Sequence, residues 1–516
     1  MKQRSRTEYS LINMFTGFVG YGLNTVIGFV CRIIFVRTLS AEYLGVSGLF
    51  TNILSVLSLA ELGISSAIIY ALYKPIAEEN HKKIAAIMQF YRKAYAAIGT
   101  FVGILGLAIM PFLDYIIKEP PAIKESIYLL YGLYLLNTVI SYFFSYRASL
   151  LTAMQRQYIV SGYNYVVTII QSVLQTIFLL TTREYIWYLL IQIAGGIGYN
   201  VWISRKASKD YPYILDKDIT PLSKAEAKDL FINIKALAIN KVSGVLVNST
   251  DNIAISFFSG ISSVGYTSNY ILLSSTVGAL IGQVFNALPG SVGNLNATAD
   301  EEGRYRFFKV LNLANFWLFG WGAIGIIFVS DDMVTLLFGS GYVLDMKIPI
   351  VLALNFYTVG MMNAIWNFKH TMGMFRYGRF VQFGTALCNL VFSLILGYFW
   401  GLFGVLFATF LSRAITNLWY DPYVVYKHGF GKNPLVYLKK YLNFAGILLG
   451  TICVCGIICR MVNYGIFVNV IIKCVVCTLI PNVIFYIIFR KYNEFMIIKN
   501  IVHNGIVIIK NKLAKK

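Results

Sequence analysis

Charged side chains inside long apolar stretches are the residues of this sequence that could do chemistry. Arg32, Lys241, Arg413 and Lys473 are such cations, and Glu61 is an anion of the same kind. A charge within a membrane helix is costly, so it marks a functional position by default. Arg32 lies near the predicted outer end of its stretch, where it could snorkel to the headgroups. Arg413 lies near the middle of its stretch, so we expect it to face protein or water.

Two of these charges have a predicted partnership. Glu61 and Lys241 lie at similar depth in the second and seventh stretches. We hypothesise that they form an ion pair in one gate state and separate in the other; alternatively, each pairs within its own half of the chain. Asp251 and Asn252 follow toward the outer end of the seventh stretch. Lys473 lies in the last stretch, where we expect a lipid-headgroup or interhelix contact.

Side-chain amides are frequent in the same stretches. Amides hold membrane helices together by hydrogen bonds, and they also suit a substrate that presents many hydroxyls, such as a sugar. Interhelix contact is the safer interpretation for most of them individually. They are Asn24, Asn137, Asn164, Gln171, Gln175, Gln192, Asn248, Asn252, Gln283, Asn286, Asn355, Asn363, Asn367, Asn389 and Asn417.

About fourteen apolar helices must position these residues. Only 13% of the 516 residues are charged and 57% are hydrophobic, whereas soluble domains carry about 25% charged residues. Each stretch is long enough to cross a bilayer, which takes roughly 20 residues. The predicted helices are 11–36, 45–72, 86–113, 124–145, 158–181, 185–204, 231–257, 262–288, 306–329, 347–368, 379–399, 402–425, 441–460 and 465–489.

The loop charges give the orientation. With the N-terminus inside, 34 Lys and Arg fall in cytoplasmic segments, 6 in external ones and 4 within helices. This alternation follows the positive-inside rule and places both termini in the cytoplasm. It also explains the net charge of +21 without a nucleic-acid partner. We therefore predict an all-α, multi-pass membrane protein.

The chain also repeats itself. Residues 43–50 resemble residues 264–270, and Gly106 to Asp114 resembles Gly325 to Asp331, both at an offset near 220. A shared offset with six helices per copy predicts two parallel six-helix lobes with a site between them. The predicted domains are an N-terminal lobe (1–204), a cytoplasmic linker (205–230), a C-terminal lobe (231–428), two extra helices (429–490) and a basic cytoplasmic tail (491–516). The tail either lies on the inner leaflet or is disordered.

Several classes of chemistry lack their motifs in this sequence. The four histidines are too far apart for metal-ligand spacing, and no nucleotide-binding glycine loop is present. Cys474 and Cys477 form a CxxC pattern in the middle of a helix, which favours packing over redox chemistry. The longest external loop, about 330–346, is too short for a catalytic domain. We therefore predict no enzyme activity and no cofactor.

Scattered short motifs resemble those of bacterial polysaccharide flippases in the multidrug/oligosaccharidyl-lipid/polysaccharide exporter superfamily. The resemblance covers nearly the whole chain. It includes Glu61 to Ile64, Asp251 to Ile253, Val264 to Tyr266, Asn363 with Asn367 to Lys369, Trp400 to Val405, Arg413, and Asp421 to Lys427.

The resemblance implies a function and a site. Such proteins carry an undecaprenyl-pyrophosphate-linked oligosaccharide from the inner to the outer leaflet by alternating access, in a V-shaped cavity between two lobes. Guanidinium and ammonium groups lower the barrier for a pyrophosphate by pairing with its oxygens. Arg413, Lys241, Arg32, Asn252 and Asn363 are then the candidate substrate-binding residues. Glu61 and Asp251 are the candidates for gating or for coupling to Na⁺ or H⁺.

Other functions stay open at this point. A cation-coupled multidrug antiporter of the same superfamily would use acidic residues such as Glu61, Asp251 and Asp421. A peptidoglycan-precursor flippase would share the anionic lipid carrier. A membrane polymerase or glycosyltransferase, and a pure scaffold, fit less well. The expected partners are the lipid-linked oligosaccharide and membrane lipids, with a polysaccharide polymerase and glycosyltransferases as further candidates, and we expect a monomer.

Overall fold

The computed structural model describes residues 6–58, 64–117, 121–144, 146–216, 221–223, 226, 228, 230, 250–286, 300–372, 374, 377 and 380–500. Within these residues the chain forms sixteen α-helices and no strand. Nine helical segments there are long and apolar enough to cross a membrane. The prediction of an all-α, multi-pass membrane protein is confirmed. Helices satisfy their own backbone hydrogen bonds, which is why such apolar stretches fold this way in lipid.

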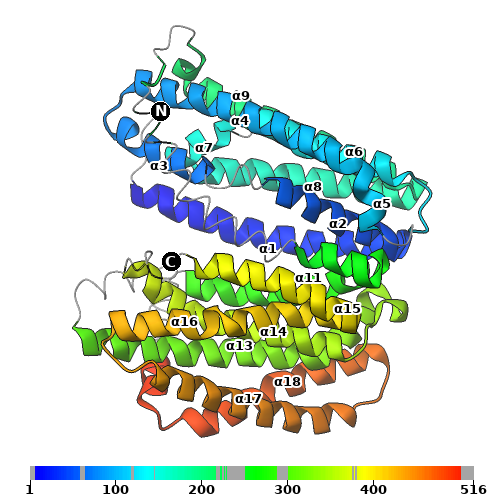
Figure 1. Ribbon diagram of the computed structural model, residues 1–516, viewed down its shortest axis with the longest axis vertical. Helices are drawn as coiled ribbons and strands as arrows, with labels where there is room; N and C mark the ends of the chain where they lie inside the picture. The colour runs from blue at the N-terminus through cyan, green and yellow to red at the C-terminus, as the bar shows by residue number, and fades with distance from the viewer. Residues whose placement is uncertain are drawn as a thin grey trace, which may run out of the picture. The chain divides into compact units, whose positions relative to one another are not determined.

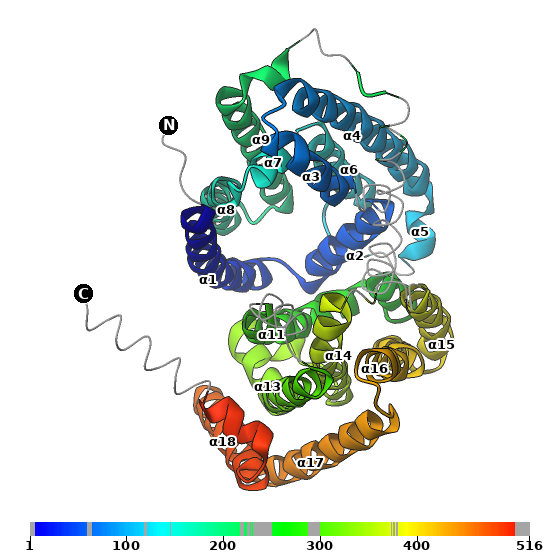
Figure 2. The same ribbon diagram turned by 90° about the vertical axis from the view of Figure 1, so that its left-hand side faces the viewer.

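The chain divides into two compact units, Met1–Gly265 and Tyr266–Lys516, which are described separately. The first unit contains α1 (Arg6–Thr38), α2 (Ala41–Leu57), α3 (Ile64–Ala77), α4 (His81–Ile109), η2 (Met110–Phe112), α5 (Leu113–Ile116), α6 (Ile127–Phe144), α7 (Tyr146–Ala153), α8 (Gln157–Thr182), α9 (Tyr185–Asp210) and η3 (Pro212–Leu215). Residues 250–259 are also helical. Helix α8 packs between α1 and α9, and α6 packs between α4 and α9 (Figure 2).

One feature of the first unit differs from the predicted helices. Within the predicted helix 45–72 the structure describes α2 as far as Leu57 and α3 from Ile64, and residues 59–63 lie outside the described residues. The segment after α6, predicted as a loop, contains the short helix α7, whose Arg147 donates hydrogen bonds to Ser204 and Ser208 of α9. Because these partners lie on another helix, the pattern around residue 147 could not indicate α7.

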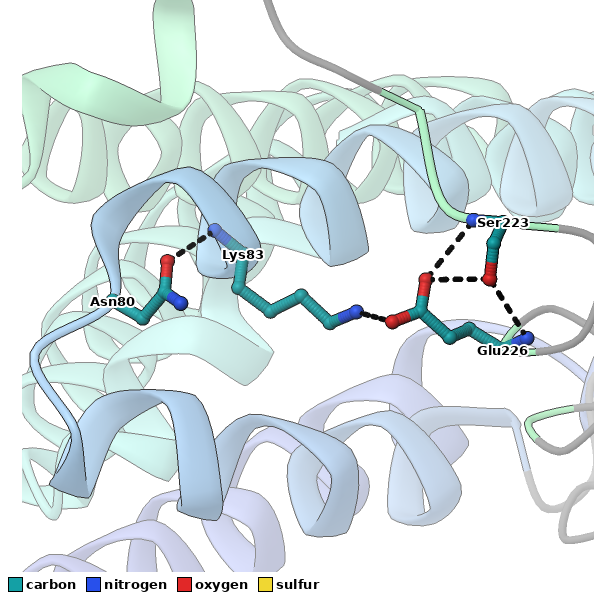
Figure 3. A network of polar contacts seen from close by, with 4 residues as sticks. All are labelled: Asn80, Lys83, Ser223 and Glu226. Atoms are coloured by element: carbon teal, nitrogen blue, oxygen red, sulfur yellow. Dashed lines mark hydrogen bonds and ion pairs between the residues drawn. The ribbon is translucent and has the colours of Figure 1, made fainter.

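The linker after α9 lies against the predicted cytoplasmic end of α4. The ring of Tyr213 stacks on that of His81, with centroids 4.4 Å apart. Glu226 forms an ion pair with Lys83, and Ser223 donates to the same carboxylate through its backbone N–H and its hydroxyl (Figure 3). Asn80 caps α4 by accepting from the N–H of Lys83. These contacts attach the predicted linker segment to the first unit.

The second unit takes most of α11 (Ile261–Asn286), followed by α13 (Glu301–Phe338), η4 (Ser340–Tyr342), α14 (Lys347–Thr371), α15 (Val381–Ile415), α16 (Asn417–Val424), the π-helical turn η6 (Val425–Gly429), α17 (Leu435–Arg460) and α18 (Ile466–Phe489). Its aromatic core includes Phe308, Phe316, Phe368 and Phe485, each fully buried. Helices α17 and α18 pack against α13 and against each other (Figure 1).

Helix α15 is two antiparallel arms joined at Gly401. This glycine has φ 55° and ψ −133°, a left-handed conformation that glycine tolerates best. A Cβ on Gly404 would lie 1.9 Å from the carbonyl oxygen of Leu396, so the arms meet closely after the turn. The predicted pair of helices 379–399 and 402–425 is therefore confirmed, with the turn between them.

The predicted external loop 330–346 is wrong in its first half. Helix α13 continues to Phe338, so Asp331 and Asp332 are helical. Each carboxylate has a partner on another helix: Lys473 lies 2.5 Å from Asp332, and the hydroxyl of Tyr270 donates to Asp331 at 2.6 Å. Lys473 thus makes the interhelix contact that was one of its two predicted roles. Cys477 packs against Cys459, with 4.0 Å between their sulfur atoms and both thiols free.

Candidate functional site

Arg32 lies on α1 beside a cluster of tyrosines in the first unit. The guanidinium is half-buried and interacts electrostatically with Tyr188 and Tyr185 of α9. The hydroxyl of Tyr185 is 2.7 Å from that of Tyr134, and Tyr134 donates to Ser47 at 2.8 Å. The hydroxyl donors of Tyr134 and Tyr185 are buried and used within the unit, so the guanidinium of Arg32 is the group of this cluster that suits an anionic ligand.

Packing of α1 on its neighbours holds this arrangement in place. Phe35, one turn beyond Arg32, makes edge contacts with Tyr185 and Tyr188 at centroid distances of 5.7 and 5.1 Å. On the other side, the sulfur of Cys31 lies 3.5 Å from the hydroxyl of Thr176 in α8. Arg32 is therefore held among protein groups. The tyrosine cluster was missed from the sequence, where its members look like ordinary interfacial aromatics.

Asp251 and Asn252 lie on the helical residues 250–259, close to α2. The Asn252 amide nitrogen lies 3.8 Å from the position that a Cβ on Gly48 would occupy. Nearby, the hydroxyl of Ser262 donates to Glu42 at 3.2 Å. Asp251 is partly buried in this region. The structure thus places the predicted Asp251–Asn252 pair against the helix that carries the first copy of the repeated motif.

The two copies of that motif contact each other reciprocally. A Cβ on Gly45 would lie 2.1 Å from the carbonyl oxygen of Ile261, and a Cβ on Gly265 would lie 2.2 Å from that of Ala41. The predicted offset of 220 residues relates Ala41 to Ile261 and Gly45 to Gly265, so it converts each contact into the other. A local two-fold relationship requires this equivalence. Glycine at both positions lets the backbones of α2 and α11 approach, as small residues do in membrane helix pairs.

In the second unit, Asp421 of α16 is the centre of a buried polar network. It is 1% exposed and lies 2.5 Å from the ammonium group of Lys369. The indole N–H of Trp366 donates to its other oxygen at 3.2 Å. Asp421 was a candidate acid for a cation antiporter. The ion pair with Lys369 makes a structural role for it between α14 and α16 the simpler interpretation.

Asn363 and Arg413 also belong to the second unit, and both are half-buried. Asn363 lies on α14, where its carbonyl accepts from the side chain of Asn367 at 3.0 Å. Arg413 lies on the second arm of α15, about two turns before Asp421. It makes interactions within the described residues, so it is not simply exposed to lipid.

Other amides hold helices together, as predicted. Asn389 donates to the hydroxyl of Thr409 at 3.1 Å between the arms of α15. Thr385 of the first arm donates to the Asn417 amide oxygen at 2.8 Å. The Gln175 amide donates to the backbone of Tyr188 at 3.0 Å, which joins α8 to α9.

Two of the predicted site residues, Glu61 and Lys241, lie outside the described residues, so their pairing stays a prediction. Asn248 and the tail beyond residue 500 lie outside them as well. Of the other predicted site residues, Arg32, Asp251 and Asn252 belong to the first unit, and Asn363 and Arg413 to the second.

No protein-family model and no curated protein matches the sequence. Solved structures do match the fold. The lipid II flippase MurJ, in an inward closed conformation, aligns over 92% of this chain and 99% of its own, with a TM-score of 0.64 and 16% identity. An inward-facing MATE multidrug transporter of the MOP superfamily aligns over 77% and 93%, with a TM-score of 0.54 and 13% identity. A mutant of the Vibrio cholerae MATE transporter VcmN aligns over 83% of this chain and 99% of its own, with a TM-score of 0.52 and 12% identity. The chain therefore has the fold of MurJ and MATE transporters.

Proposed function

We propose that this chain is an alternating-access transporter that moves a lipid-linked oligosaccharide from the inner to the outer leaflet of a bacterial cell membrane. The observation that carries the proposal is the fold shared with a lipid II flippase over nearly the full length of both chains. The substrate class comes from the sequence resemblance to polysaccharide flippases. The oligosaccharide would serve the synthesis of a surface polysaccharide, supplied and extended by glycosyltransferases and a polymerase.

The half-buried cations support an anionic headgroup as cargo. Arg32 and Arg413 each lie within an apolar helix, where a charged residue is costly and most often has a functional role. A guanidinium binds phosphate oxygens through two parallel hydrogen bonds, which an ammonium group cannot do. The amides of Asn252 and Asn363 would bind sugar hydroxyls. The lipid tail would stay in the bilayer, so only the headgroup needs a polar path.

Arg413→Ala tests this site. We expect it to reduce export by about 10-fold or more, because losing one charge-assisted hydrogen-bonded contact costs roughly 1.5–3 kcal/mol. The measurement follows lipid-linked oligosaccharides in cells lacking the protein. An impermeant glycosidase reports which sugars have reached the outer leaflet. Inner-leaflet accumulation that the intact protein reverses, and Arg413→Ala does not, supports the proposal.

Arg460→Ala is the matched control, because this arginine is exposed at the end of α17. It should export normally. Membrane levels of both variants are compared first, so that lost insertion is not taken for lost transport. Normal export by Arg413→Ala would remove Arg413 from the site, and unchanged lipid-linked sugars in the deletion strain would contradict the proposed cargo.

Two other cargoes follow from the same fold. A peptidoglycan precursor is favoured by the similarity to the lipid II flippase, and rescue of cells depleted of their own precursor flippase would support it. Multidrug antiport is favoured by the similarity to MATE transporters, and efflux of cationic drugs would support it. For any of these cargoes, Glu61 and Asp251 are the residues that we propose for coupling to Na⁺ or H⁺.

A further inference from the structure

A groove of about 540 Å³ runs between α8 and α9 in the first unit. Its wall is almost entirely apolar and includes Ile170, Leu174 and Ile191. On α9 the lining residues recur at positions 191, 195, 198, 202 and 205, which is one face of a helix. The opposite face carries Asn200, Ile203 and Ala207, which are buried in the unit. The groove therefore opens on the side of α9 away from the protein core.

Two glycines shape the groove. A Cβ on Gly195 would lie 2.4 Å from the side-chain oxygen of Gln171, so α8 and α9 approach closely at that level. A Cβ on Gly198, one turn further, would meet no atom within 4 Å. The missing side chain at Gly198 thus leaves a recess that no other part of the described chain fills. An apolar recess at this depth is suited to a hydrocarbon chain.

One end of the groove is polar and basic. The Trp202 ring stacks on Tyr163 at 4.3 Å, an arrangement typical of the membrane interface. Arg205 lines the groove one turn beyond Trp202 and is exposed. Nearby, Arg156 and Lys206 pair with Asp210 at 2.9 Å, Arg147 donates to Ser204 and Ser208, and Lys209 is exposed. This end therefore attracts an anion.

We propose that the groove binds one acyl chain of an acidic phospholipid, whose phosphate pairs with Arg205. The combination of a hydrocarbon recess and a cationic mouth one turn apart matches the two parts of such a lipid. The loop charges place this mouth at the cytoplasmic leaflet, where anionic lipids attract basic residues. The lining residues of the groove include none of the predicted cargo-binding residues, so a lipid bound there would regulate or stabilise the transporter rather than be its cargo.

The test uses the full-length protein in nanodiscs of phosphatidylcholine that contain a rising fraction of brominated phosphatidylglycerol. Bromine on the acyl chain quenches tryptophan at contact, and the signal of Trp202 is the difference between the intact protein and Trp202→Phe. We expect half-quenching at a lower mole fraction for brominated phosphatidylglycerol than for brominated phosphatidylcholine. Arg205→Gln should raise the mole fraction at half-quenching about fivefold for brominated phosphatidylglycerol and leave it unchanged for brominated phosphatidylcholine. The fivefold change corresponds to the binding free energy of about 1 kcal/mol that one basic residue contributes near an anionic surface.

Gly198→Leu should abolish saturable quenching by both lipids, because the added side chain fills the recess. Its matched control is Gly132→Leu on α6, where a Cβ also meets no atom within 4 Å. Lys209→Gln, an exposed cation that does not line the groove, controls for charge. Quenching that Gly198→Leu leaves intact would overturn the acyl-chain site, and equal binding of both lipids would overturn the acidic headgroup. A dimer that Gly198→Leu converts to monomer would make a second copy the occupant and would also overturn the proposal.

Discussion

At the scale of single residues, the Lys369–Asp421 pair shows how this protein keeps charge inside a helical bundle. Asp421 is buried, and both of its oxygens have donors. Removing one member of a buried pair costs about 3–5 kcal/mol, because the other charge is left uncompensated. We therefore expect Asp421→Ala to lower the thermal unfolding temperature in detergent strongly.

Replacing both partners separates this charge effect from packing. Lys369→Met with Asp421→Leu should recover most of the lost stability, since apolar residues of similar volume often replace a buried pair without cost. A double variant as unstable as Asp421→Ala would mean that the ion pair is not the source of the effect. Asp421→Asn keeps the acceptor for Trp366 and isolates the loss of charge.

The Lys83–Glu226 pair makes a second residue-scale prediction, on pH. The Lys83 ammonium group and the two donors of Ser223 lower the pKa of the Glu226 carboxyl from 4.5 to about 2. Because the pKa of Glu226 is lowered in the folded protein, its ion pair with Lys83 contributes fully to linker docking at pH values above the ordinary pKa of 4.5. This contribution is lost as the pH falls from 4.5 toward the folded-state pKa of about 2.

Hydrogen exchange measures that docking. The amides of residues 222–226 should have similar protection from exchange at pH 5 and pH 7, and Glu226→Gln should accelerate their exchange at both pH values. Glu78→Gln, at the exposed pair with Lys74, is the control and should leave these amides unchanged. The measured exchange rates are corrected for the intrinsic effect of pH on amide exchange. If the corrected exchange of the intact protein is faster at pH 5 than at pH 7, the lowered pKa of Glu226 is contradicted.

At the scale of elements, the crossing of α2 and α11 depends on two glycines. Gly45→Ala and Gly265→Ala would each force the backbones apart, and such overpacking costs typically 1–3 kcal/mol. Because the contacts are reciprocal, the double variant should lose less than the sum of the single losses. Gly22→Ala on α1 is the control, since a Cβ there meets no atom within 4 Å. If Gly22→Ala lowers the thermal unfolding temperature as much as Gly45→Ala or Gly265→Ala, the close approach of α2 and α11 is not the cause of the lost stability.

Elements whose determinants are local could be predicted from the sequence. The two arms of α15 correspond to two predicted apolar helices, 379–399 and 402–425, and the offset of the repeat placed Gly45 and Gly265 in equivalent positions. Elements with distant determinants could not. Asp331 and Asp332 looked like loop residues, because Tyr270 and Lys473, which make them tolerable inside a helix, lie far away in sequence. The tyrosines around Arg32 come from α6 and α9, so no local pattern indicated their cluster.

At the scale of the whole molecule, the charges of the described units fall into two kinds. Lys369 and Lys473 pair with acids of neighbouring helices within one unit, so they stabilise it. Arg32, beside the tyrosines of α9, and Arg413, on the second arm of α15, are half-buried, and we propose that they meet an anionic headgroup. The sequence could indicate that all four are costly, but only the structure shows that Lys369 and Lys473 pair with acids of neighbouring helices.

Glu61 and Lys241 carry the prediction that involves both lobes. If they pair in one gate state, Glu61→Lys and Lys241→Glu should each reduce export by roughly 10-fold, because contacting charges couple by about 0.5–3 kcal/mol. The combined swap restores opposite charges and should recover export, as the glycosidase assay measures. If each residue instead pairs within its own lobe, the swap creates two mismatched sites and should be worse than either single change. Recovery would therefore identify a contact that opens and closes during transport, whereas a deeper loss would assign both charges to the interior of their own lobes.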